Sequence, residues 1–160
     1  MAKTVFFSFH YQRDVHRVQL VRQINALEGQ PLLNSQTWEE VRRQGSAAIQ
    51  KWIDDQMAYK KAVIVLVGKE TAERPWVKYE IERAWSIKKP LLGVRIHGIS
   101  SMGDVDGPGA NPFEKADIDG GQVPLFDPTA IGLSGKINSQ ATYGNISRNL
   151  TSWSEQGATR

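Results

Sequence analysis

Trp76 and Glu80 are the two residues whose types and spacing most readily suggest chemistry on a ligand. They lie four residues apart in a stretch, 76–88, whose apolar residues recur at helical spacing, so we expect both on one face of a helix, one turn apart. A carboxylate in a site of low effective dielectric can stabilise positive charge that develops on a substrate. An indole ring beside it can stack on a planar group. This pair is therefore the candidate reaction centre.

The same helix also offers Glu80 a purely structural role. Arg83 follows Glu80 at i+3, and Lys78 and Glu82 are four residues apart. Glu80 can therefore belong to a row of solvated ion pairs that contributes only a few tenths of a kcal/mol, roughly, to stability. A helical glutamate is usually a surface residue, so the residues alone favour this second interpretation.

Ser8 is a further candidate because it lies near the carboxyl end of an apolar run, residues 5–9, which predicts a buried strand. Its hydroxyl can bind a ribose or phosphate oxygen, but serine is equally common as a simple strand-to-loop residue. The next side chains, Phe9, His10 and Tyr11, are candidates for the wall of a pocket at this end of the strand.

No metal site is predicted. His10, His16 and His97 are not spaced with one another or with nearby carboxylates as metal ligands are, and we expect each to be a surface or capping histidine. The chain contains no cysteine, which excludes disulfides, thiolate ligands and a cysteine nucleophile.

Length and charge narrow the class of protein. The 160 residues correspond to about one domain. Twenty Lys and Arg residues against seventeen Asp and Glu give a net charge of +3, with no basic run of the kind that nucleic-acid binders carry. No signal segment and no apolar stretch approaching ~20 residues is present. We therefore expect a cytoplasmic protein that binds neither nucleic acid nor membrane.

Strand and helix patterns alternate over residues 4–96, which predicts a parallel sheet with right-handed crossovers. The run 62–67 is uninterrupted and apolar, as central parallel strands are. Asp14 is the expected N-cap of the first helix, and Trp52 and Trp85 are expected in the core. The predicted strands are 5–9, 32–33, 62–67 and 91–96, and the predicted helices are 14–27, one from residue 46 through Met57, and 76–88.

The composition of the chain changes after residue 97. Residues 98–121 are rich in Gly, Asp, Pro and Ser, and a loop of this length is usually functional or mobile. A short edge strand at 123–126 and a closing helix at 143–154 are expected after it. We therefore predict a single domain over 1–160, with a core at 3–96, a long loop at 98–121 and a C-terminal strand and helix extension at 122–160.

Several segments resemble TIR domains. Residues 5–9 are similar to the first TIR strand, in which an apolar run ends in Ser followed by an aromatic residue. Residues 76–81 are similar to the Trp-x-x-x-Glu helix of TIR domains that consume NAD. The resemblance covers roughly residues 3–115 and is closest to stand-alone bacterial proteins, specifically the TIR-like subunits of the Thoeris anti-phage system. Other matching positions are Trp38, Gly45, Trp52, Ile53, 63–67, 92–94 and 111–113.

The resemblance implies a fold and a site. The fold is a three-layer, flavodoxin-like α/β domain with a parallel sheet of order 2-1-3-4-5 and helices on both faces. The nucleotide lies at the carboxyl end of the first strand, between its loop and the helix that bears Glu80, which agrees with the general position of ligands in open α/β sheets. Glu80 is the implied catalytic residue. The implied substrate-binding residues are Trp76, Ser8, Phe9, His10 and Tyr11.

The chain departs from the TIR pattern in its first loop. Many TIR domains carry Tyr in place of Phe9, and some carry basic residues in place of His10 and Tyr11, so phosphate contacts from this loop are in doubt and Arg13 is a poor substitute by position. In TIR domains the loop that here contains Asn34, Thr37 and Trp38 also mediates self-assembly. Turn, cap and buried-ring roles for these three residues are at least as plausible.

The implied activity is cleavage of the nicotinamide–ribose bond of NAD, which is a substrate here, with no cofactor expected. Nicotinamide leaves as a neutral pyridine and needs no general acid, so one of the two carboxylates of ordinary glycosidases is dispensable. The resemblance further implies an ADP-ribosyl cyclase whose cyclic product is a signal sensed by a separate effector protein. Hydrolysis and transfer to another acceptor share the same first step. A non-catalytic module that works by TIR–TIR assembly and a nucleoside-processing transferase are the alternatives.

Overall fold

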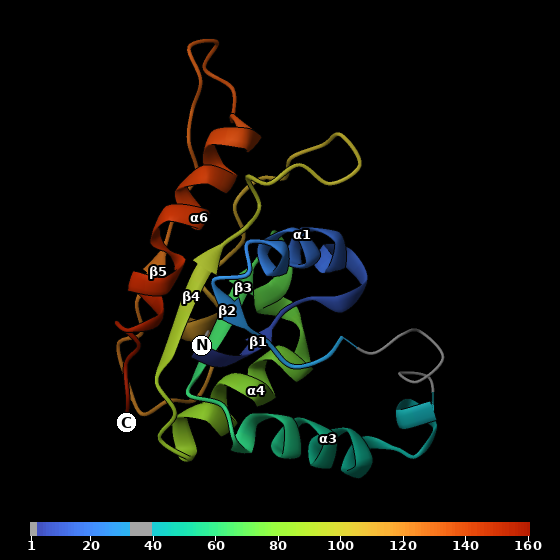
Figure 1. Ribbon diagram of the computed structural model, residues 1–160. Helices are drawn as coiled ribbons and strands as arrows, with labels where there is room; N and C mark the ends of the chain where they lie inside the picture. The colour runs from blue at the N-terminus through green and yellow to red at the C-terminus, as the bar shows by residue number, and fades with distance from the viewer. Residues whose placement is uncertain (1–2, 33–39) are drawn as a thin grey trace.

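The apolar runs pair side by side into a five-stranded, all-parallel sheet. The structure, a computed structural model, describes residues 3–32 and 40–160. The strand order is β2-β1-β3-β4-β5, as the resemblance implied (Figure 1). Phe6 of β1 is in register with Val63 of β3, and Val65 of β3 with Gly93 of β4. The strands are β1 (Lys3–Ser8), β2 (Leu27–Glu28), β3 (Ala62–Val67), β4 (Leu91–Arg95) and β5 (Leu125–Phe126).

Helices cover both faces of this sheet, which confirms the three-layer α/β fold. Successive strand residues point to opposite faces, and β3 is buried along its whole length. One face packs against α1 (Tyr11–Gln23) and α6 (Ser139–Ser154). The other packs against α3 (Ser46–Ala58) and α4 (Pro75–Ser86). The short elements are η1 (Thr71–Glu73) and α5 (Pro112–Lys115).

The first helix and the second strand differ from the prediction. Helix α1 begins at Tyr11 and ends at Gln23, and His10 rather than Asp14 caps it, with Nδ1 accepting from the backbone N–H of Arg13 at 3.3 Å. Asp14 lies inside the first turn, where its N–H already donates to the carbonyl of His10, and its side chain is buried beside Arg17. The chain then reverses at Asn25, whose φ is +62°, so the second strand forms at Leu27–Glu28, and Leu32 of the predicted strand 32–33 is not in a strand. Leu33 lies outside the described residues.

The C-terminal part follows the prediction more closely. The edge strand β5 lies within the expected segment 123–126. Helix α6 starts four residues earlier than expected, because the side chain of Asn138 caps it by accepting from the N–H of Ala141. Within the described ranges, every helix is too short or too polar to cross a bilayer.

Candidate active site

A cavity of about 210 Å³ lies at the carboxyl end of β1. Its wall combines β1 and the loop after it, the loop after β2, and residues of α3 and α4, so elements distant in sequence meet here. The cavity therefore occupies the edge of the sheet where open α/β folds place their ligands. The lining residues are Phe6, Phe7, Phe9, His10, Tyr11, Gln12, Gln30, Pro31, Leu32, Arg42, Trp52, Ile53, Arg74, Trp76, Val77 and Glu80.

Glu80 is buried in this wall and not part of a solvated ion-pair row. It is only 8% exposed, and its Oε1 accepts a hydrogen bond of 2.8 Å from the hydroxyl of Ser8. The neighbouring charges on α4 pair elsewhere: Arg83 with Asp54 at 3.2 Å and Lys78 with Glu82 at 3.9 Å. The structure thus removes the surface interpretation of Glu80.

The surroundings of Glu80 change its acidity. Burial raises the pKa of this carboxyl from 4.5 to about 8, and the hydrogen bond from Ser8 opposes the rise only in part. The acidity of Glu80 is shifted without help from any charged neighbour among the described residues. At neutral pH the empty cavity therefore holds mostly the protonated acid, and a cationic group bound against it would favour the carboxylate.

Aromatic rings form much of the remaining wall. Trp76 is half-buried and meets Tyr79 edge-on, with ring centroids 5.7 Å apart. The rings of Phe9 and Tyr11 stack 5.8 Å apart at an interplanar angle of 27°. Trp52, which the sequence placed in the core, is only partly buried and lines the cavity. Planar groups of a ligand would find stacking partners on more than one side.

The predicted site residues therefore gather at one place, with one difference in position. Glu80, Trp76, Phe9, His10 and Tyr11 all line the cavity, whereas Ser8 is fully buried behind it and is bound to Glu80. His10 has two tasks, because it also caps α1. Burial, with a smaller effect of the nearby Arg74, lowers the pKa of His10.

The lining residues that the sequence did not single out as site residues include Gln30, Arg42, Trp52 and Arg74. Gln30 is buried and its side-chain amide pairs with both backbone groups of Phe7 at 2.8 Å, in the manner of a strand neighbour. Nothing in the local sequence distinguishes this glutamine. Arg42 and Arg74 could not be assigned to the cavity from the sequence, because their positions depend on how distant segments pack together in the fold.

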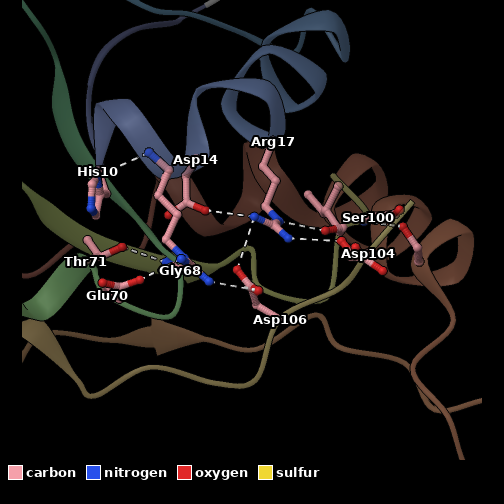
Figure 2. Close-up of polar contacts among 12 residues, drawn as sticks. His10, Asp14, Arg17, Gly68, Glu70, Thr71, Ser100, Asp104 and Asp106 are labelled. Carbon is pink, nitrogen blue, oxygen red and sulfur yellow. Dashed lines mark hydrogen bonds and ion pairs between the residues drawn. The ribbon is translucent and has the colours of Figure 1, made fainter. Parts of the chain in front are cut away.

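A network of ion pairs lies beside the cavity, and we call it the arginine clamp: Arg13, Asp14, Arg17, Glu70 and Asp106 (Figure 2). Arg17 contacts Asp14 at 3.0 Å and Asp106 at 3.3 Å. Arg13 contacts Glu70 at 2.6 Å and Asp106 at 3.1 Å. The charge of Arg13 is thus paired with carboxylates within the clamp.

The clamp fixes the start of the long loop to α1. Arg17 donates to the backbone carbonyls of Ile99 at 2.7 Å and Asp104 at 3.2 Å. No residue of 98–121 is among the lining residues of the cavity. In this arrangement the long loop braces the helix that carries His10 and Tyr11, and it does not cover the cavity.

Two other predictions concern histidines and the assembly loop. Among residues 3–32 and 40–160, no three acidic or histidine side chains gather as metal ligands would. His97 is buried, not a surface histidine, and its Nε2 lies 3.3 Å from the hydroxyl of Thr129. Asn34, Thr37 and Trp38 lie outside the described residues.

Comparison with known proteins decides the family. Residues 6–101, more than half of the chain, match the family described as "Thoeris protein ThsB, TIR-like domain". The chain belongs to this family. It is also 30% identical, over 139 residues, to a protein of Bacillus cereus (strain MSX-D12) named "Putative cyclic ADP-D-ribose synthase ThsB1". That alignment covers 81% of this chain and 72% of the relative. The ThsB TIR-like match includes both Ser8 and the Trp76–Glu80 helix.

Proposed function

We propose that this protein cleaves the nicotinamide–ribose bond of NAD and joins the freed ribose carbon to the adenine of the same molecule, giving a cyclic ADP-ribose-type product. The name of the ThsB1 relative supports this reaction. The observation that carries the proposal for this chain is Glu80, a carboxyl buried in the cavity wall whose pKa no cationic side chain of the described residues lowers.

The first step breaks the bond between the ribose anomeric carbon and the pyridinium nitrogen. Both electrons of that bond leave with nicotinamide, which becomes neutral, and the sugar becomes an oxocarbenium-like cation. The carboxylate of Glu80 stabilises that cation, and it does so strongly because Glu80 itself is buried. Trp76 and the Phe9–Tyr11 pair hold the planar rings of the substrate.

The second step decides the product. An adenine ring nitrogen attacks the anomeric carbon to close the cyclic product, whereas attack by water would give ADP-ribose. Aromatic walls that keep water from the anomeric carbon favour attack by the adenine nitrogen, and therefore cyclisation. In a Thoeris setting, the cyclic product would be a signal for a separate effector protein, and TIR–TIR assembly would accompany its synthesis.

Glu80→Gln tests the proposal directly. Cells that carry the wild type or this variant are infected with phage, and NAD and its products are followed by HPLC. The wild type should consume NAD and form a cyclic product, and Glu80→Gln should lower consumption by about a hundredfold or more.

Glu82→Gln is the matched control, since it makes the same chemical change on the same helix outside the cavity. Equal consumption and equal protection with Glu80→Gln and the wild type would remove Glu80 from catalysis. Protection without consumption would instead indicate a module that works by assembly.

A further inference from the structure

Two arginines belong to the lining of the cavity. Arg42 lies in the helical stretch 40–43, and Arg74 immediately precedes α4; both are exposed and both line the cavity. Among the described lining residues, Glu80 is the only acidic side chain, and it sits at the buried end. The cavity therefore combines a buried acidic group with an exposed cationic entrance, which favours a ligand with negative charge at one end.

Arg74 has donors available for such a ligand. It forms no ion pair with any described residue, and although it is the N-cap residue of α4, its side chain makes no capping bond. Its charge contributes to the lowered pKa of His10, which places the guanidinium near the cavity wall. Arg13 and Arg17, by contrast, are both paired with carboxylates of the arginine clamp.

The positions of Arg74 and Glu80 along α4 match the layout of a dinucleotide. Glu80 follows Arg74, the N-cap residue, by six positions, which corresponds to about 9 Å along the helix axis. Trp76 lies between them. In NAD the reacting ribose carbon and the diphosphate lie on opposite sides of one ribose. A substrate with that carbon against Glu80 would direct its diphosphate along the helix toward Arg74.

We propose that Arg74 binds the diphosphate of the dinucleotide, so that the cavity selects nicotinamide dinucleotides over nicotinamide nucleosides. This inference rests on the proposed function. An arginine can donate two parallel hydrogen bonds to phosphate oxygens. The phosphate contact thus comes from the start of α4 and not from the loop after β1, where basic residues are missing.

Binding measured by calorimetry tests the assignment, with Glu80→Gln as the background so that no turnover occurs. The ligands are NAD, ADP-ribose and nicotinamide riboside, of which only the last lacks a diphosphate. Adding Arg74→Ala should lower the affinity for NAD and for ADP-ribose by about tenfold or more, and it should leave the affinity for nicotinamide riboside unchanged. Adding Arg74→Lys should restore part of the loss.

Lys78→Ala is the matched control, because it removes one positive charge from the exposed face of the same helix outside the cavity lining. It should leave the affinity for all three ligands unchanged. In the active protein, Arg74→Ala should raise KM for NAD with little change in kcat. The loss of NAD affinity should also shrink at high salt, which a merely structural role would not cause.

Three results would overturn the inference. If Arg74→Ala leaves the affinity for NAD unchanged while the wild type still consumes NAD, the assignment of Arg74 is wrong and the proposed function stands. An equal loss for nicotinamide riboside has the same meaning. If the wild type neither binds nor consumes NAD, the proposed function fails and this inference fails with it.

Discussion

Two buried carboxyl groups flank the carboxyl end of β1, and they have opposite surroundings. Asp14 is fully buried in the arginine clamp, where Arg17 contacts it at 3.0 Å and is itself held by backbone carbonyls (Figure 2). Glu80 is buried in the wall of the cavity, where it accepts a hydrogen bond from the neutral hydroxyl of Ser8. Burial raises the pKa of both carboxyls, but only Asp14 has a cation beside it to oppose the rise.

The comparison separates a structural acid from one that can act on a ligand. A buried charge without a partner is costly, so the fold supplies Arg17 to Asp14. It supplies no such partner to Glu80 among the described residues, and the protein tolerates this by keeping the acid protonated. The missing charge can then come from the substrate. A perturbed carboxyl in a cavity is a typical feature of a reaction centre.

The largest expected effect is on stability, from breaking the clamp. Arg17→Met leaves Asp14 buried without its cation and should lower the free energy of unfolding by about 3–5 kcal/mol, measured by urea denaturation. Lys51→Met, which breaks the exposed pair with Asp55, should cause no measurable change. A similarly negligible change for Arg17→Met would mean that the clamp does not stabilise the fold.

Whereas Arg17→Met should destabilise the protein, Glu80→Gln should become more stable relative to the wild type as the pH rises. Since the folded-state pKa of Glu80 is about 8, above its ordinary 4.5, the folded protein holds an extra proton between these values. Wild-type stability therefore falls as pH rises through this window. Gln does not titrate, so the stability of the variant relative to the wild type should increase from pH 5 to pH 8.5, by about 2–4 kcal/mol.

Urea denaturation at both pH values measures this change, and the titration of histidines cancels in the difference. Glu82→Gln serves again as the matched variant. If the difference between Glu80→Gln and the wild type stays constant with pH, Glu80 is ionised in the folded protein and the contrast with Asp14 is lost.

A smaller effect is expected where the clamp meets β3. A Cβ at Gly68 would collide with the carboxylate of Asp14, whose Cγ it would approach to 2.8 Å. Gly68→Ala should therefore lower stability by about 1–3 kcal/mol, measured as a fall in Tm. Gly107→Ala is the control, because a Cβ there meets nothing within 4 Å. Equal Tm values for both variants would show that Asp14 moves without cost.

Ser8→Ala tests the surroundings of Glu80, the second of the two buried carboxyls. Its hydroxyl favours the ionised form of Glu80, so the variant should raise the pKa of Glu80 further. In the wild type, kcat/KM for NAD should rise with pH through about 8. In Ser8→Ala this rise should move up by about one pH unit, which lowers activity at pH 7 about tenfold. A drop of equal size at every pH would mean that Ser8 acts on the substrate and not through Glu80.

The sequence predicted those parts of the fold and site that depend on local patterns. Long apolar runs identified β1, β3 and β4, and the spacing of Trp76 and Glu80 placed both on one helix face. The two-residue strand β2 is too short for a pattern, and its position depends on the turn at Asn25. The cap at His10 was missed because Asp14 is a preferred capping residue by type, and its burial beside Arg17, which is itself held by a loop some ninety residues away, is not visible in the local sequence.

The roles of the arginines also could not be predicted from local sequence patterns. The sequence does not distinguish Arg13, Arg17 and Arg74 from one another, and which of them pairs with a carboxylate depends on where Glu70 and Asp106 lie in the fold. The ionisation of Glu80 likewise depends on burial by β1 and its loop, which spacing alone does not reveal.

The pKa of Glu80 itself tests the central claim most directly. Carbon-13 NMR of labelled glutamate carboxyls follows its titration, with Glu80→Gln to assign the resonance. A carbocyclic NAD analogue supplies the pyridinium charge without cleavage. We predict a pKa near 8 in the empty protein and a clear fall when the analogue binds. A pKa near 4.5 in the empty protein, or one that the bound analogue does not lower, would contradict the account.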